Sequence, residues 1–134
     1  MSLDIDQLVR QLDDPDVAQR QAAAEALAQA GELVGAQAPA IIRALSDDDE
    51  TTREWLTSAL EDAGPPAPDA VAPLAQLVAD DELDAAYWAA TFLGRLGADA
   101  ADAAPTLQHC STQSAHPAVR KRAAWALDQI RRSG

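Results

Sequence analysis

Three residues between positions 109 and 116 carry side chains that can bind soft metal ions. His109, Cys110 and His116 offer the nitrogen and sulfur donors that suit Zn²⁺. A structural zinc site needs four ligands, and the sequence places no fourth ligand close to these three. We therefore expect surface or loop residues at all three positions and predict no metal site.

Two runs of carboxylates are the second candidate for chemistry. They are Asp47–Glu50 and Asp80–Glu82, and clustered oxygens suit Ca²⁺. Both runs lack the glycine and the spaced glutamate of an EF-hand loop. Carboxylates also stabilise the first turn of a helix, where backbone N–H groups are unpaired. We expect these runs to cap helices.

Motifs for catalysis are missing from the sequence. It contains no glycine-rich phosphate loop and no Gly-x-Ser-x-Gly. The sequence therefore predicts no catalytic residue and no cofactor. A binding function is favoured over an enzymatic one.

Composition indicates helices. Of the 134 residues, 48% are apolar but only 4% are aromatic, and roughly a quarter are alanine. Such a composition favours helices packed closely through small side chains. No apolar run reaches the length of about 20 residues that spans a bilayer, and a single cysteine cannot form an internal disulfide. We expect a cytoplasmic protein that does not enter a membrane.

The net charge of −12 is unevenly distributed. Residues 1–102 carry a net charge of −16, whereas residues 103–134 carry +4. An acidic field of this size repels phosphate backbones, so we predict no nucleic-acid partner.

A repeat of about 33 residues organises the chain. The segment Ala26–Gly31 recurs at residues 59–64, 92–97 and 126–131, with successive offsets of 33, 33 and 34. Each repeat holds a short and a long apolar-periodic segment, which predicts a helical hairpin. The short helices are expected near 3–12, 37–46, 69–79 and 102–111, and the long helices near 16–30, 49–63, 82–96 and 117–132.

Turn-forming residues support these boundaries. Pro15 and Pro117 suit a first helical position. Within the two carboxylate runs, Asp47 to Asp49 and Asp80 to Asp81 offer N-caps. Gly31, Gly64 and Gly97 suit the left-handed residue after a helix. The repeat keeps its phase through residues 64–68, so we predict a single domain over residues 1–134. Its repeats are expected at about 3–31, 36–64, 68–97 and 101–132.

The segment Val119-Arg120-Lys121-Arg122-Ala123-Ala124-Trp125-Ala126-Leu127 resembles the second helix of HEAT repeats of the phycobilisome-lyase-like kind. The resemblance implies an all-α fold, a right-handed α-solenoid of four antiparallel helix pairs. The third repeat departs from the pattern, with Ala85 and Ala86 where Val-Arg is usual. We expect this departure to remove polar contacts between repeats.

The repeat register predicts which side chains of the long helices point away from the core. In HEAT solenoids the second helices line the concave face, so aromatic side chains there would anchor a partner. The predicted partner-binding residues are Tyr87, Trp88, Thr91, Arg95, Lys121, Trp125, Trp55 and Glu54. Trp125 is expected well outside the apolar stripe, with Gly94 and Ala118 leaving it accessible.

These features predict a protein-interaction module that binds a protein or peptide on the concave face. Acidic side chains of the first two repeats, such as Glu25 and Glu61, would select a partner with basic character. Three alternatives stay open: a bilin-lyase-like enzyme or accessory subunit, a section of a longer structural solenoid, and a homodimer that uses the aromatic patch.

Overall fold

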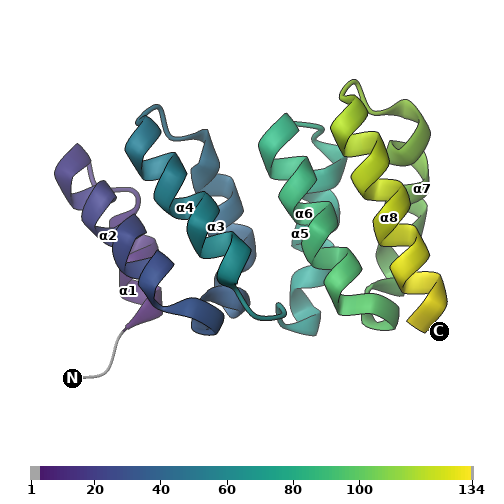
Figure 1. The fold of residues 1–134 in the computed structure, drawn as a ribbon, viewed down its shortest axis with the longest axis horizontal. Coiled ribbons are helices and arrows are strands. Elements are labelled where there is room, and N and C mark those ends of the chain that lie inside the picture. Colours follow the sequence, from purple (N-terminus) through teal and green to yellow (C-terminus); the bar gives the residue numbers. More distant parts are fainter. Residues whose placement is uncertain (1–3, 134) are drawn as a thin grey trace. The chain divides into compact units, whose positions relative to one another are not determined.

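The computed structural model describes residues 4–133 of the chain, and helices are the only regular secondary structure in that range. The chain forms two compact units, unit 1 over residues 1–64 and unit 2 over residues 65–134. Each unit contains two helix pairs (Figure 1). The beginning of the first predicted helix and repeat, at residue 3, lies outside the described residues.

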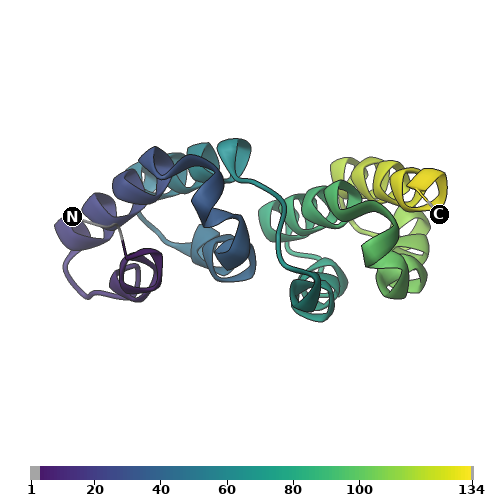
Figure 2. The same cartoon turned by 90° about the horizontal axis from the view of Figure 1, so that it is seen from below.

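Unit 1 has a layer of long helices and a layer of short helices, which Figure 2 shows from below. The long helices α2 (Val17–Gln29) and α4 (Glu50–Asp62) pack side by side. The other elements of the unit are α1 (Ile5–Gln11), η1 (Gly31–Gln37), α3 (Ala38–Arg43) and η2 (Ala44–Ser46).

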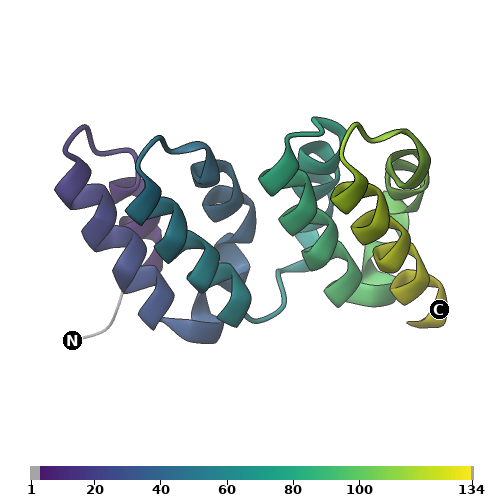
Figure 3. The ribbon, with the colours of Figure 1, turned by 45° about the horizontal axis from the view of Figure 1, so that its top comes forward.

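Unit 2 repeats this arrangement. Its long helices α6 (Leu83–Leu96) and α8 (Pro117–Ser133) pack against each other, and Figure 3 shows each pair of neighbouring long helices. The remaining elements are η3 (Pro68–Ala70), α5 (Val71–Ala79), η4 (Gly97–Ala103) and α7 (Ala104–Gln113). The fold is therefore an α-solenoid of HEAT-type helix pairs. The single-domain organisation stays a prediction.

The core follows the repeat register. Equivalent leucines of the four long helices are 0–4% exposed, and the large apolar side chains of three short helices are fully buried. These residues are Leu27, Leu60, Leu93 and Leu127 on the long helices, and Ile41, Leu74 and Leu107 on the short ones. Leu8, their counterpart in α1, is half-buried.

Helix starts agree only in part with the prediction. Asp49 is the N-cap of α4 and Pro117 begins α8, as expected. The prediction for Pro15 was wrong, because Asp16 is the N-cap and α2 begins at Val17. The prediction of an N-cap at Asp80 or Asp81 was also wrong. Glu82 holds that position, and its side chain makes no capping hydrogen bond.

Two of the three glycine predictions are confirmed. Gly31 and Gly97 have φ values of 63° and 61°, in the region that favours glycine, and each begins a 3₁₀ helix that the sequence did not predict. Gly64 does not have a positive φ. Its N–H donates to the Glu32 carbonyl oxygen, and an added Cβ would lie 3.1 Å from that oxygen, so the close backbone approach explains this glycine.

Candidate functional site

A pocket of about 280 Å³ lies on the exposed side of the α6–α8 pair. Its lining residues are Tyr87, Ala118, Lys121, Arg122 and Trp125, and we call it the Trp125 pocket. Tyr87 comes from the first half of α6, and the other four come from the first half of α8. Three of the predicted partner-binding residues, Tyr87, Lys121 and Trp125, therefore meet at one place.

The Arg122 guanidinium contacts both aromatic rings of this pocket. Its Cζ is 4.8 Å from the Tyr87 ring centroid and 4.8 Å from the Trp125 ring centroid. Its Nη2 also donates to the Tyr87 hydroxyl oxygen at 2.7 Å. Cation–π contacts with two rings and one hydrogen bond together hold the cation in place.

Trp125 is half-buried, which corrects the prediction that it lies well outside the apolar stripe. Its six-membered ring lies over Gly94 of α6, where an added Cβ would be only 2.3 Å from Trp125 Cζ3. Gly94 therefore receives the ring and does not leave open space beside it. One part of the Trp125 ring packs between the helices, and another part lines the pocket.

Thr91 was expected to point outward, and this was wrong. It is only 5% exposed, and its hydroxyl donates to the Tyr87 carbonyl oxygen at 2.8 Å, because α8 packs across this part of α6. Trp88 is half-buried and makes an edge-on contact with Tyr87, at 5.8 Å between centroids. Arg95 is exposed, and its guanidinium lies 5.0 Å from the Phe92 ring centroid. None of these three side chains lines the Trp125 pocket.

Two predicted partner-binding residues, Trp55 and Glu54, belong to α4 of unit 1. Trp55 is half-buried, whereas Glu54 is exposed. Other exposed carboxylates of the long helices in this unit are Glu25, Glu61 and Asp62. By sequence, residues 1–64 have a net charge of −10 and residues 65–134 have a net charge of −2.

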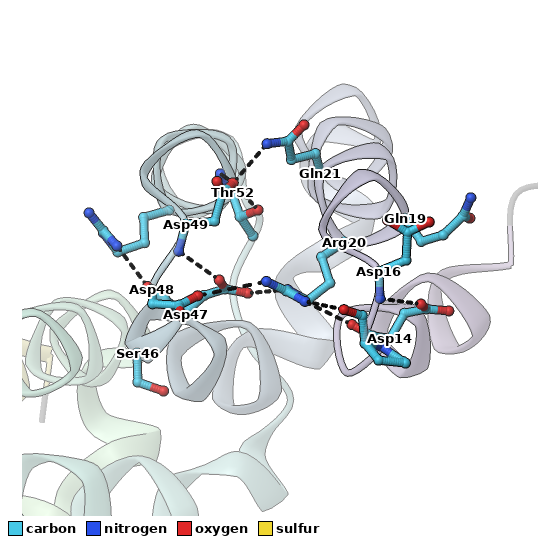
Figure 4. Close-up of polar contacts among 12 residues, drawn as sticks. Asp14, Asp16, Gln19, Arg20, Gln21, Ser46, Asp47, Asp48, Asp49 and Thr52 are labelled. Carbon is cyan, nitrogen blue, oxygen red and sulfur yellow. Dashed lines mark hydrogen bonds and ion pairs between the residues drawn. The ribbon is translucent and has the colours of Figure 1, made fainter.

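The first carboxylate run links the two repeats of unit 1 (Figure 4). Arg20 Nε donates to Asp47 Oδ2 at 2.9 Å, and Arg20 Nη1 donates to the Asp14 carbonyl oxygen at 3.0 Å. Asp49 accepts hydrogen bonds from Gln21 and Thr52, and these bonds hold the pKa of the Asp49 carboxyl below its usual value. The run thus caps α4 and also joins it to α2.

The second carboxylate run also joins two repeats, those of unit 2, but without an arginine. Ala86 occupies the register position of Arg20, so the arginine contact is lost, as the sequence predicted. Asp81 replaces it by accepting hydrogen bonds from the Ser114 hydroxyl at 2.5 Å and the Ala115 N–H at 2.9 Å. These two bonds lower the pKa of the Asp81 carboxyl. A polar contact between the repeats is therefore retained.

The three soft donors do not form a metal site. His109 is exposed on α7, and His116 lies beside the Asp81 carbonyl oxygen at 3.1 Å. The prediction of a surface or loop position was wrong for Cys110, which is 4% exposed, with its Sγ 3.6 Å from the Val78 carbonyl oxygen. Burial, with the nearby Asp81 charge, raises the pKa of the Cys110 thiol and keeps it protonated. Residues 4–133 contain no group of three or more side chains able to hold a metal ion.

Sequence reasoning did not assign Arg122 or Ala118 to the binding site. The usable signal was the register, because Arg122 lies one repeat beyond Trp88, 34 residues later, on the flank that meets the preceding long helix.

Other pockets lie on the short helices, such as one of about 360 Å³ lined by Val9, Leu12 and Arg43 among others. That pocket contains no aromatic ring.

In the described part of the chain, no helix is long and apolar enough to cross a membrane.

Comparisons with known proteins agree with this architecture. An engineered protein of known crystal structure superposes with a TM-score of 0.59 at 22% identity, and the match covers 97% of this chain and 63% of that one. This chain therefore spans less than two thirds of that protein's length. A designed armadillo repeat protein in complex with the peptide (KR)4 gives a TM-score of 0.55 at 16% identity, with 98% and 71% coverage. No curated protein sequence matches significantly. A family model for HEAT repeats matches residues 5–94, more than half of the chain, and the protein therefore belongs to the HEAT repeat family.

Proposed function

We propose that this protein is a non-enzymatic interaction module that binds a protein or peptide segment on the exposed face of its long helices. The observation that carries the proposal is the Trp125 pocket, where Tyr87, Lys121 and Trp125 line an open hollow between neighbouring long helices. Aromatic and cationic side chains around a hollow are the residue types that anchor protein interfaces. Trp88 and Arg95 would support this face from α6, and Trp55 and Glu54 would offer a second binding surface on α4 of unit 1.

Unit 1 supports a preference for a basic segment. Its net charge of −10 and the exposed carboxylates of α2 and α4 attract cations. The similar designed armadillo repeat protein was solved with the peptide (KR)4, which is itself basic. We infer that unit 1 selects basic character in the partner.

The anchoring role is tested with a displayed random-peptide library selected on the full chain. Peptides that bind the wild type should lose at least about tenfold in affinity for Trp125→Ala or Tyr87→Ala, because truncating a central aromatic anchor costs more than about 1.4 kcal/mol. Leu83→Ala is the matched control, since Leu83 is an exposed apolar side chain of α6 outside the pocket. Equal losses in all three variants would contradict an anchor at the pocket.

The basic preference is tested with fluorescein-labelled (KR)4 and measurement of anisotropy. Glu54→Gln combined with Glu61→Gln should weaken binding, and raising the salt concentration should weaken it further. Asp99→Asn combined with Asp102→Asn removes the same charge from exposed sites in unit 2 and is the control. If both pairs weaken binding equally, or if (KR)4 fails to bind at low salt, unit 1 does not select basic peptides.

A further inference from the structure

The geometry of the Trp125 pocket points to a ligand chemistry different from that of unit 1. We infer that this pocket receives the carboxylate of a Glu or Asp side chain in an acidic peptide segment. The inference rests on the proposed function, because it names what binds at the site proposed above. Its basis is the arrangement of two cations, two aromatic rings and the space between them.

Arg122 is oriented to bind a planar anion. Its guanidinium lies over the rings of both Tyr87 and Trp125, and one N–H group is used by the Tyr87 hydroxyl. A guanidinium has five N–H donors that lie in the plane of the group, so the bond to the Tyr87 hydroxyl leaves other donors for a ligand. Two parallel N–H groups match the spacing of two carboxylate oxygens. Arg122 is therefore prepared to bind a carboxylate without further ordering of its side chain.

Lys121 adds a second positive charge at the same pocket. Its side chain is exposed and has no hydrogen-bond or ion-pair partner in the described part of the chain. No carboxylate lines the pocket, and Asp128, the one acidic residue of α8, pairs with Arg132 instead. The pocket lining therefore carries two positive charges and no negative one, although the whole chain is acidic.

Size and polarity favour a single side chain as the part that enters. A volume of about 280 Å³ is slightly below the range of about 300–1,000 Å³ that is usual for small-molecule sites. The Tyr87 and Trp125 rings and the Ala118 methyl group offer an apolar wall for the methylene groups of a Glu side chain. A Lys or Arg side chain would meet two like charges there. The basic preference proposed for unit 1 thus does not extend to this pocket.

The test uses the full chain and two terminally blocked, fluorescein-labelled octapeptides, (Glu-Ala)4 and (Gln-Ala)4. These probes have nearly the same size and differ in charge. We expect (Glu-Ala)4 to bind at least about tenfold more tightly, because hydrogen bonds to charged groups contribute more than those to neutral groups. Arg122→Lys should remove most of this difference, since an ammonium group cannot form the two parallel bonds. Lys121→Gln should reduce it less.

Arg132→Gln is the matched control, because it removes one positive charge from the same helix at an exposed position outside the pocket. It should leave (Glu-Ala)4 binding unchanged. Equal binding of the two octapeptides, or an equal effect of Arg132→Gln and Lys121→Gln, would overturn the carboxylate site. Binding of (KR)4 to the same samples reports on the proposed function separately. If (KR)4 binds and (Glu-Ala)4 shows no preference, only the inference of this section fails.

Discussion

At the scale of single residues, Gly94 and Trp125 determine how closely α6 and α8 meet. The Trp125 ring occupies the volume that any larger residue at position 94 would need. Gly94 also lies in the last turn of α6, inside the helix, where glycine is unfavourable relative to alanine by up to about 1 kcal/mol. The glycine is therefore explained by the ring of the neighbouring helix and not by its own helix.

This explanation predicts a change of sign in a double-mutant cycle. Gly94→Ala should destabilise the wild type by about 1–3 kcal/mol, because its Cβ forces the Trp125 ring to move. In a Trp125→Ala background the same substitution should instead stabilise the protein, by up to about 1 kcal/mol, because only helix propensity remains. Urea denaturation of the four proteins measures both effects. The same effect of Gly94→Ala in both backgrounds would contradict the contact.

Asp81 gives a pH dependence whose sign follows from its hydrogen bonds. The bonds from Ser114 and Ala115 lower the pKa of the folded carboxyl below the value of about 3.9 of an unfolded chain. Its contribution to stability is thus complete above about pH 5 and is lost as the pH falls through the folded pKa. The difference in unfolding free energy between wild type and Asp81→Asn should shrink between about pH 5 and pH 2.

Asp80→Asn provides the control for this titration, because it removes a neighbouring negative charge without removing the contacts with Ser114 and Ala115. Asparagine is also a suitable replacement at position 81, where φ is 54°, because it tolerates left-handed backbone. A difference that does not change with pH would show that the ionised form of Asp81 has no special role.

Residue positions were predicted well where they depend on one helix and poorly where they depend on two. The buried leucines follow from the helical period. The half-buried ring of Trp125 and the buried Thr91 arise where α8 crosses α6, and a projection of a single helix does not include its neighbour. Cys110 was misplaced for the same reason, because its contact is with Val78 on α5.

At the scale of the elements, each unit joins its two repeats by a polar contact near the starts of its long helices. In unit 1 an arginine of the first repeat binds an aspartate of the second, Arg20 with Asp47. In unit 2 the charged residue is instead an aspartate of the earlier repeat. Asp81 accepts hydrogen bonds from Ser114 and Ala115 of the later repeat. The repeat register located the missing arginine at Ala86, but the replacement by Asp81 needed the positive φ of that residue, which the sequence does not reveal.

The contact in unit 1 predicts a selective loss of stability. Arg20→Ala should lower the unfolding free energy by roughly 1–3 kcal/mol, because the Asp47 side chain, only 10% exposed, would lose its charged partner. Arg43→Ala, at an exposed site on α3, should change it by less than about 0.5 kcal/mol. Thermal or urea denaturation distinguishes the two variants. Similar losses from both would show that the loop contact contributes nothing particular.

At the scale of the whole molecule, the repeat is regular in its core and different in the charge of its two units. The all-α repeat fold was predictable because a period of 33 residues recurs in phase four times. The difference between a net charge of −10 in residues 1–64 and −2 in residues 65–134 was also readable from the sequence. The pairing of Arg122 with two rings was not, because it depends on how neighbouring helices pack.

The most direct test of binding on the long helices is a ¹⁵N spectrum of the tryptophan indole groups of the full chain. The three tryptophans, Trp55, Trp88 and Trp125, all lie on long helices, and Trp→Phe variants assign their signals. The backbone amide of His109, on the short helix α7, gives a signal in the same ¹H–¹⁵N spectrum and reports on the other layer. We predict that (Glu-Ala)4 shifts the Trp125 signal and (KR)4 shifts the Trp55 signal, both saturably, while His109 stays unchanged. Indole signals that do not move while residues of the short helices shift would contradict the account.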